Sequence, residues 1–413
     1  MQTILKKICR IRPGHVLAFL FLLYMAVMAF HCLPQVIYEA GRCLYWKTGY
    51  QEFIDSVDDY SQDLLPFDRN QMPLLDKGTY INLNGLMAKT LGQPTLNERT
   101  ILKNGLLASI SDAAPQEADL QEAADNLILF CREHEKTGGK FLFVMAPSKI
   151  SKYENVLPVG FTDTDNDTAD ALIAMLEEGG VPVLDLRETL HNSGMPWKEA
   201  FFVTDHHWTP QTGFLAYREI TETLAAMGAA DPVDPFYTDE ANFTFHTYKD
   251  TFLGSAGKRT GIYYAGIDDS VFIAPNFPTD IHLTIPEIEL DLQGLYQQVS
   301  YHQRVYVDLE KPDYFNVNMY GLYGWGDRGL SQWRNESASV KQRVLLIGDS
   351  FANVPFSLMS IAYSSCDEMD MRHFEEDFTQ YYWEYQPETV VFLINPNHCI
   401  SDFTETTFLQ SEK

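Results

Sequence analysis

The chain has 413 residues, of which 45% are hydrophobic and 13% aromatic, so it carries enough apolar side chains for a sizeable core and is not disordered as a whole. Its 57 acidic and 30 basic residues give a formal net charge of -27, which opposes general affinity for nucleic acid or anionic lipid head groups. The composition therefore excludes a protein that binds phosphate backbones, and nucleic acid is not an expected partner.

The first 33 residues differ from the rest, with four basic residues, no acidic residue and an uninterrupted apolar stretch over residues 16–30. With its flanks, this stretch is long enough to cross a bilayer as a helix. Because the basic residues precede it, we expect a cytoplasmic stub at 1–14, a transmembrane signal anchor at 15–33 and an extracytoplasmic remainder. A cleaved signal peptide or a lipid-modified Cys32 would share these features, but the length of the stretch favours a retained anchor in the cell membrane.

Beyond the anchor, residues 34–100 mix aromatic and acidic stretches with proline and glycine, which indicates a membrane-proximal segment leading into a globular fold. From residue 101 to 413, helical periodicity alternates with short apolar runs, which predicts an α/β domain with a parallel sheet covered by helices on both faces. The expected helices cover 118–134 and 169–178, and the expected strands cover 140–146, 182–186, 344–347 and 389–394. Residues 235–335, rich in Tyr, Asn, Pro and Gly, are predicted to be an insertion or cap.

Four cysteines follow the predicted anchor, which is too few for a disulfide framework in so large a domain. One bridge, between Cys366 and Cys399, and buried free thiols are the two alternatives. No spacing of Cys or His indicates a structural metal, so neither a metal nor another cofactor is expected.

The first candidate catalytic motif is Phe-Phe-Val-Thr-Asp-His-His-Trp-Thr-Pro at residues 201–210. In an extended backbone, Asp205 and His207 project to one side and His206 to the other, which pairs a base with an orienting carboxylate. The Thr-Pro that follows predicts the start of a helix that holds this pair rigidly. Alternatively, the histidines contact surface carboxylates or bind a metal, although adjacent histidines lack the i, i+4 spacing of helical metal sites.

The second motif is Val-Leu-Leu-Ile-Gly-Asp-Ser-Phe at residues 344–351, a buried strand that ends in a turn and leads towards a helix. Ser350 is thereby placed at the carboxyl end of the sheet, beside N–H groups that can stabilise an oxyanion. The alternative is that Asp349 and Ser350 are simply turn and N-cap residues. Together, the two motifs supply a nucleophile, a base and an orienting acid.

In this order, the two motifs resemble the DHHW family and the related alginate-acetylation proteins of the SGNH hydrolase superfamily. Further similarity lies in residues 140–149, which end in Ala-Pro-Ser-Lys, in residues 252–259 and in the closing strand, so the resemblance spans roughly residues 75–400. It implies an SGNH-hydrolase-like parallel sheet flanked by helices. It also implies a Ser-His-Asp triad in which Ser350 is the nucleophile, His207 its base and Asp205 the orienter.

The resemblance leaves the oxyanion hole and the substrate contacts open. The block that supplies an oxyanion asparagine in typical SGNH enzymes is not legible, so Asn353, Arg259 and Asn395 are the candidates. Lys149 is a candidate for binding an anionic sugar or carboxylate, or alternatively a solvated loop lysine. Four aromatic residues are candidates for stacking on sugar rings, with core packing as the alternative: Trp208, Trp325, Tyr320 and Tyr323.

The function implied by the resemblance is O-acetylation of a cell-surface or exported polysaccharide by a membrane-anchored, extracytoplasmic serine O-acyltransferase. A multi-span membrane acyltransferase would hand the acetyl group across the bilayer. Water as the acceptor would make the protein an acetylesterase of the same fold, and a catalytically silent protein for glycan binding or assembly is the third alternative. The strong acidity of the external part favours a neutral acceptor over a polyanionic one.

Overall fold

The computed structural model describes residues 19, 21–23, 26, 77–301 and 312–400. The chain divides into two compact units, Met1–Thr79 and Tyr80–Lys413. Among the described residues, no helix has both the length and the apolar character that a membrane crossing requires. The predicted stub and the first part of the membrane-proximal segment lie outside these residues, and so does most of the predicted anchor, so the membrane topology stays a prediction.

The described part of the second unit alternates helices with strands along most of its length. Its helices are α4 (Lys77–Thr90), α5 (Glu117–Lys136), α6 (Asp165–Glu178), α7 (Leu186–Ser193), α8 (Pro210–Ala226), α9 (Ser255–Thr260), α10 (Ile262–Ala265), α11 (Tyr296–Val299), α12 (Asn353–Ala362) and α13 (Phe378–Tyr385). Its strands are β1 (Thr95–Leu96), β2 (Arg99–Ile101), β3 (Leu107–Ala108), β4 (Lys140–Met145), β5 (Val183–Asp185), β6 (Phe243–Phe252), β7 (Asp268–Pro275), β8 (Ile281–Ile285), β9 (Leu290–Gly294), β10 (Ser331–Arg334), β11 (Val340–Gly348), β12 (Tyr363–Met369) and β13 (Thr389–Ile394). The helices and strands predicted from periodicity are all present, as α5, α6, β4, β5, β11 and β13.

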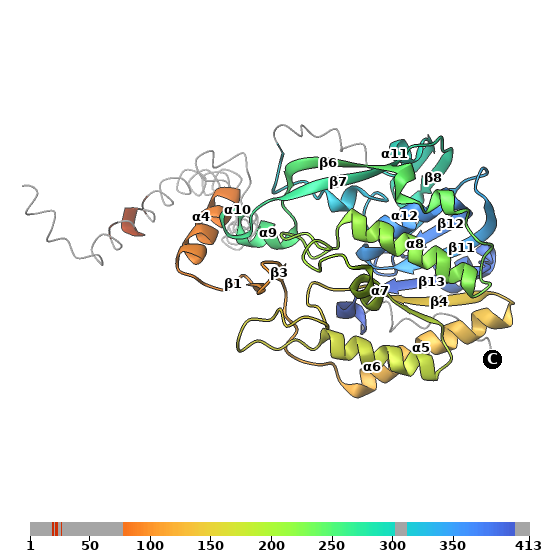
Figure 1. Cartoon of the computed structure of the whole chain (residues 1–413), viewed down its shortest axis with the longest axis horizontal. Helices are drawn as coiled ribbons and strands as arrows, with labels where there is room; N and C mark the ends of the chain where they lie inside the picture. Colours follow the sequence, from red (N-terminus) through yellow and green to blue (C-terminus); the bar gives the residue numbers. More distant parts are fainter. Residues whose placement is uncertain (1–18, 20, 24–25, 27–76, 302–311, 401–413) are drawn as a thin grey trace, which may run out of the picture. The chain divides into compact units, whose positions relative to one another are not determined.

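The core of the unit is an eight-stranded sheet with the order β5-β4-β13-β11-β12-β10-β8-β9 (Figure 1). The first five strands run parallel to one another, whereas β10, β8 and β9 pair antiparallel. The predicted α/β class is therefore confirmed, but a wholly parallel sheet is wrong. The reason is local, because β8 and β9 are joined by a short turn, and such a turn can only connect antiparallel neighbours.

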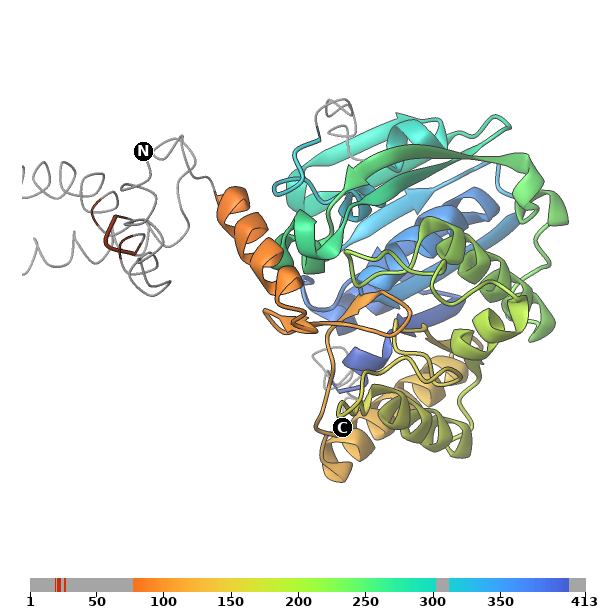
Figure 2. The same ribbon diagram turned by 60° about the vertical axis from the view of Figure 1, so that its left-hand side comes forward.

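Helices cover both faces of the parallel half of the sheet (Figures 1 and 2). On one face, Val344 and Leu346 of β11 pack with residues of α7, α8 and α12. On the other, Leu345 and Ile347 pack with residues of α5, α6 and α13. All four side chains are fully buried, which explains why this strand reads as a continuous apolar run in the sequence.

The region predicted as an insertion, residues 235–335, contributes in two ways. Strands β6 and β7 form a separate two-stranded ribbon, while β8, β9 and β10 extend the central sheet. Part of the region is therefore continuous with the sheet, because the short alternating runs read from the sequence bury one face of β8 and of β10. In β8, for example, Ile281, Leu283 and Ile285 are buried and the residues between them are half-buried.

Several alternatives left open by the sequence are resolved by burial. The aromatic residues proposed for sugar stacking belong to the core, since none of them is more than 8% exposed: Trp208, Trp325, Tyr320 and Tyr323. Cys366 and Cys399 are both buried thiols that form no disulfide with each other. Buried free thiols behave as small hydrophobic side chains here.

The carboxyl ends of β4, β13 and β11 lie side by side because these strands are parallel neighbours. The loops that follow them therefore meet at one edge of the sheet, which is where open α/β folds bind ligands. Helix α8 is held close to this edge through α12: at Gly213, a Cβ atom would lie 2.5 Å from Cγ1 of Val354. The absence of a side chain at Gly213 is what permits this close helix packing.

Replacing Leu346 with Ala tests the importance of the central strand. Leu346 is fully buried in β11, so its truncation should lower the free energy of unfolding by about 2–5 kcal/mol. Leu129→Ala is the matched control, since Leu129 on α5 is 43% exposed, and it should change stability by less than about 0.5 kcal/mol. Urea unfolding followed by circular dichroism measures both variants, and equal losses would contradict the described packing.

Candidate active site

The motif at residues 201–210 forms a tight loop that ends at the start of α8. Phe201 and Trp208 pair across its base through an isolated bridge, and the chain bends between them. The extended backbone expected from the sequence is therefore wrong. The expected pairing nevertheless forms, because the bend brings the imidazole of His207 against the carboxylate of Asp205.

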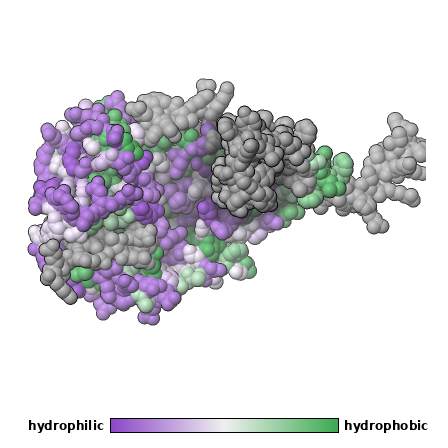
Figure 3. Space-filling model, turned by 180° about the vertical axis from the view of Figure 1, so that it is seen from behind, coloured by the Kyte–Doolittle hydropathy of each residue, from purple (hydrophilic) through white to green (hydrophobic). Residues whose placement is uncertain are grey.

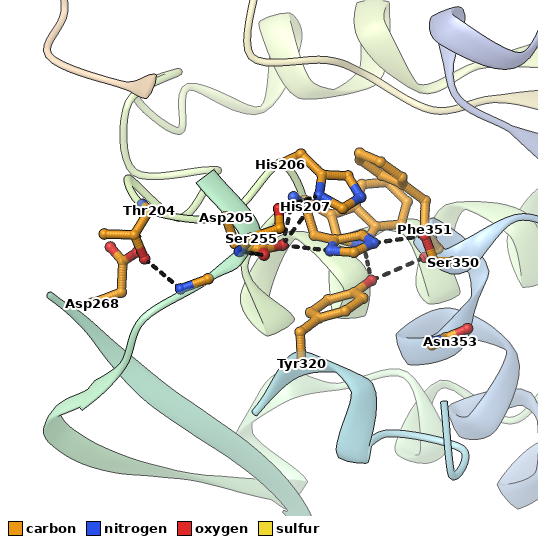
Figure 4. A network of polar contacts seen from close by, with 12 residues as sticks. Thr204, Asp205, His206, His207, Ser255, Asp268, Tyr320, Ser350, Phe351 and Asn353 are labelled. Carbon is orange, nitrogen blue, oxygen red and sulfur yellow. Dashed lines mark hydrogen bonds and ion pairs between the residues drawn. The ribbon is translucent and has the colours of Figure 1, made fainter. Parts of the chain in front are cut away.

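A second carboxylate, that of Asp268 at the start of β7, fixes this loop (Figure 4). It accepts the N–H groups of Val203 at 2.9 Å and Thr204 at 2.7 Å, as well as the Thr204 hydroxyl at 2.6 Å. The Thr204 Oγ1 atom in turn accepts the N–H of Gly254, and its carbonyl accepts the N–H of Gly257, both at 2.8 Å. The loop is thus tied to both β7 and α9, and no local motif predicts these contacts.

Asp205 is buried and has a donor on each carboxylate oxygen. Its Oδ1 atom lies 2.5 Å from Nδ1 of His207, and its Oδ2 accepts the N–H of Ser255 at 2.7 Å. A Cβ at position 254 would lie 2.2 Å from Cβ of Asp205, so only Gly254 allows this approach. Burial alone would raise the pKa of Asp205, but His207 and the Ser255 N–H hold that pKa well below its usual range. The carboxylate is therefore ionised and oriented.

His207 connects this carboxylate to the second motif. Its Nε2 atom lies 2.7 Å from Oγ of Ser350, on the opposite side of the ring from Asp205 (Figure 4). The ring stacks on Tyr320, with centroids 3.9 Å apart and an interplanar angle of 12°. The Tyr320 hydroxyl accepts the indole N–H of Trp208 at 3.1 Å, so the stacking partner is itself held in place. The structure therefore brings together Ser350, His207 and Asp205.

Ser350 lies just after β11, at the first residue of a short 3-10 helix (Ser350–Ala352) that runs into α12. Asp349 caps this turn, because its Oδ1 atom accepts the N–H of Phe351 at 2.9 Å. The N-cap alternative from the sequence is thus correct for Asp349. The Ser350 side chain is instead directed to His207.

The other oxygen of Asp349 binds the segment that follows β13. Oδ2 accepts the Asn395 N–H at 2.9 Å, the Asn395 amide at 2.8 Å and Nδ1 of His398 at 2.7 Å. Burial alone would raise the pKa of Asp349, but His398 and Asn395 lower it. Conversely, burial would lower the pKa of His398, but Asp349 raises it. These opposite shifts favour the charged form of each group, and the contact joins the ends of two neighbouring strands.

A cavity of about 160 Å³ lies beside Ser350. It is lined by Ala108, Ser109, Ser148, Lys149, Ile150, Asp165, His206, Ser350, Phe351, Arg372, Asn395, Asn397 and His398. Sequence reasoning missed Asp165, Arg372, Asn397 and His398 because no motif marks them. The one available signal was that Asn397 and His398 directly follow the closing strand, at the edge where Ser350 was expected.

The candidates for the oxyanion hole are placed differently from one another. Asn395 lines the cavity, but its amide donates to Asp349. Asn353, on the first turn of α12, donates its amide to Asp327 at 3.1 Å and does not line the cavity. Arg259, on α9, is 56% exposed and lies 3.8 Å from the Glu98 carboxylate, also away from the cavity. The structure therefore does not bring Asn353 or Arg259 to the site.

Lys149 is buried beneath the Asp205 loop, so the alternative of a solvated loop lysine is wrong. Its Nζ atom donates to the carbonyls of Leu107 at 2.6 Å and Val203 at 2.9 Å. Burial lowers the pKa of Lys149 to about 7. Since two donors are used on backbone carbonyls, the ammonium group braces the loop from below while its side chain forms part of the cavity wall.

Two groups of described residues bring potential metal ligands within 4.8 Å of one another. The first is Asp205, His206 and His207, and the second is Asp327, Asp370 and His373. In the first group, the Asp205–His207 contact already pairs a donor with an acceptor. In the second, the Asp370 carboxylate already accepts the guanidinium of Arg372. A metal ion would have to displace these contacts.

Comparison with known proteins places this site in a recognised class. Residues 106–246, which include the loop of Asp205 and His207, match the sequence profile of a family described as SGNH hydrolase-like domain, acetyltransferase AlgX. A search of curated protein sequences gave no match. This part of the chain is therefore similar to SGNH hydrolase-like domains.

Three solved structures share the fold of this chain. PatB1 from Bacillus cereus superposes with a TM-score of 0.60 at 18% identity, over 75% of this chain and 97% of that one. PatB1 with a sulfonyl adduct gives 0.60 at 16% identity, over 76% and 99%. A DHHW family protein from Eubacterium siraeum gives 0.58 at 15% identity, over 77% and 98%. The resemblance predicted from the sequence is thus confirmed: residues 106–246 are similar to an SGNH hydrolase-like acetyltransferase domain, and the fold is shared with PatB1 and the DHHW family protein.

The buried lysine predicts a specific pH dependence of stability. Between about pH 7 and the ordinary lysine pKa of 10.5, the unfolded chain binds a proton at Lys149 that the folded chain does not. The free energy of unfolding should therefore gain a component that rises with pH over this interval, and Lys149→Met should lack it. Urea unfolding at several pH values measures the difference between the two proteins. Parallel pH profiles would contradict the lowered pKa.

Proposed function

We propose that this chain is a membrane-anchored, extracytoplasmic serine O-acyltransferase that acetylates a cell-surface or exported polysaccharide. The observation that carries the proposal is the continuous contact from Ser350 Oγ through the His207 ring to Asp205, with distances of 2.7 and 2.5 Å, beside a cavity. This is the arrangement of nucleophile, base and orienting acid that acyl transfer requires. The match to an acetyltransferase family supports acetyl as the transferred group.

In the first half of the proposed reaction, Nε2 of His207 takes the hydroxyl proton of Ser350 while Oγ attacks the carbonyl carbon of an acetyl ester or thioester. The Asp205 carboxylate stabilises the imidazolium that forms. The tetrahedral intermediate collapses when its bond to the leaving oxygen or sulfur breaks, and His207 returns the proton to that atom. The products are the acetylated Ser350 and the free alcohol or thiol.

In the second half, a sugar hydroxyl takes the place of the leaving group. His207 removes its proton, the hydroxyl oxygen attacks the acetyl carbon, and the bond to Oγ of Ser350 breaks as the proton returns to Oγ. Asn397 is the asparagine of the cavity whose amide is not committed to Asp349, and we assign it to the developing oxyanion. With water as the acceptor, the same steps would release acetate.

The sequence supports the proposed location. A basic stub followed by the apolar stretch at 16–30 favours an anchor that leaves the rest of the chain outside. A multi-span membrane acyltransferase is the proposed source of the acetyl group, because an acyl donor made in the cytoplasm must cross the bilayer to reach an external enzyme.

Replacing Ser350 with Ala should remove acyl transfer. Without Oγ no acetyl-enzyme can form, so cleavage of a chromogenic acetyl ester by the full chain should fall by about 10⁴-fold or more. Ser109→Ala is the matched control, because Ser109 lines the same cavity but does not contact His207, and it should keep most of the activity. Equal activity of Ser350→Ala and the parent chain would overturn the triad assignment.

A sulfonyl fluoride provides a chemical test of the same nucleophile. PatB1, which shares the fold, has been seen with a sulfonyl adduct. The full chain should therefore gain one sulfonyl group on Ser350, located by peptide mass spectrometry, and Ser350→Ala should gain none. His207→Ala should react far more slowly because the serine loses its base. Modification of a different residue in the parent chain would contradict the proposal.

The choice between transfer and hydrolysis depends on the acceptor. When a neutral oligosaccharide is incubated with an acetyl ester and the full chain, mass spectrometry should show acetylated sugar in excess of free acetate. A polyanionic oligosaccharide of similar length should be a poorer acceptor, because the chain carries a net charge of -27. Free acetate alone would identify an esterase, and glycan binding without turnover would identify a silent binding protein.

A further inference from the structure

Helix α4 carries an unusual group of exposed apolar side chains. Leu83, Leu86, Met87 and Leu91, the last just beyond the helix end, are between 44% and 71% exposed. Their spacing of three and four residues places them on one face of the helix. Tyr263 of the neighbouring α10 is 54% exposed. By contrast, the coloured residues in Figure 3 show a mainly hydrophilic face, with hydrophobic side chains in small separate groups.

The opposite side of α4 is fixed to the rest of the second unit. At Gly85, a Cβ would lie 2.1 Å from the carbonyl oxygen of Thr260, so the helix packs directly on the backbone of α9. The Asn82 side chain accepts the N–H of Ile262 at 2.7 Å, which holds the start of α10. Figure 1 shows α4 and α10 side by side. The exposed apolar face of α4 is therefore held in place from the side of the helix on which Gly85 packs.

The charge around this face is opposite to that of the chain. Helix α4 contains no acidic residue, although the chain has 57 acidic and 30 basic residues. Lys89 lies on the helix. Arg259 lies close enough to Arg99 for its positive charge to help lower the pKa of Arg99. Glu98 is the one acidic residue within residues 80–105 and 255–266, and it lies 3.8 Å from Arg259. The local excess of positive charge therefore remains.

We infer that this surface binds an anionic lipid bilayer. This contact would be a second one, in addition to the predicted anchor. The α4 surface is defined by the apolar residues Leu83, Leu86, Met87, Leu91 and Tyr263 with the basic residues Lys89, Arg99 and Arg259. An apolar helix face with basic side chains beside it is the pattern of an interfacial helix, whose apolar side chains enter the boundary of the acyl chains while the cations contact head groups. Arg259, which the sequence offered for the active site, acquires a role here.

Two further considerations favour lipid as the occupant. The apolar stretch at 16–30 precedes α4 in the same chain. If this stretch anchors the chain, it raises the effective concentration of the α4 surface at the bilayer, so a modest affinity of that surface for lipid suffices. A second copy of the chain is a poorer fit. A two-fold contact through the α4 surface would place its own arginines and lysine opposite one another.

The test uses a fluorescent nitrobenzoxadiazole probe on the full chain in vesicles. Cys9, Cys32 and Cys43 are replaced by Ser and the probe is attached at Met87→Cys, while the described cysteines are buried. In vesicles of equal parts phosphatidylcholine and phosphatidylglycerol, brominated lipids should lower the emission about two-fold, as expected for a probe at the acyl boundary. The same probe at Val159→Cys, 95% exposed in the loop before α6, should be unaffected.

Charge and apolar contributions are then separated by variants. Lys89→Glu combined with Arg259→Glu should reduce the quenching at position 87, and so should vesicles of phosphatidylcholine alone. Leu83→Glu combined with Leu91→Glu should abolish it. A probe at 87 that is quenched by aqueous iodide and untouched by brominated lipid would overturn the proposal. So would a probe shielded from both quenchers, since that result would mean that a protein segment or a second copy covers the α4 surface.

Discussion

The hydrogen bond between His207 and Ser350 is the contact on which the site depends, because it joins segments that are 143 residues apart in the chain. Each side chain is positioned by a carboxylate of its own segment, and His207 also by a ring from a distant one. His207 is oriented by Asp205 and by the stacked ring of Tyr320, and Ser350 is held by the turn that Asp349 caps. The geometry is fixed before any substrate arrives, which is what a site for transient charge requires.

Two carboxylates, that of the half-buried Asp268 and that of the buried Asp349, act as the anchors of this arrangement. Asp268 accepts hydrogen bonds from the loop that contains His207, and Asp349 accepts them from the segment after β13. Each has both oxygens occupied by N–H or O–H donors, and these charge-assisted hydrogen bonds offset part of the cost of burying the charge. A carboxylate with hydrogen bonds to both oxygens resists movement. The two carboxylates therefore hold the backbone around His207 and Ser350 in place.

The sequence allowed prediction of what depends on local pattern. Strands β4, β11 and β13 are buried on both faces, so their continuous apolar runs allowed them to be predicted. The motifs that contain His207 and Ser350 likewise allowed these two residues to be predicted as candidates. The roles of Asp268 and of His398, the partner of Asp349, could not be predicted, because each residue acts through a partner far along the chain. The antiparallel half of the sheet and the burial of Lys149 were missed for the same reason. Neither a short segment of alternating apolar residues nor a lysine in a loop shows in the sequence which part of the chain will pack against it.

The position of β13 in the sheet has a consequence for how the protein is made. This strand is the last of the described strands in chain order, yet it lies between β4 and β11. Until residues 389–394 have been synthesised, the two halves of the sheet have no common neighbour, and Asp349 lacks its partners Asn395 and His398. Completing the sheet and assembling the reacting groups are therefore one late event in folding. A chain that has not yet added β13 therefore lacks both the completed sheet and the contacts that hold Asp349 in place.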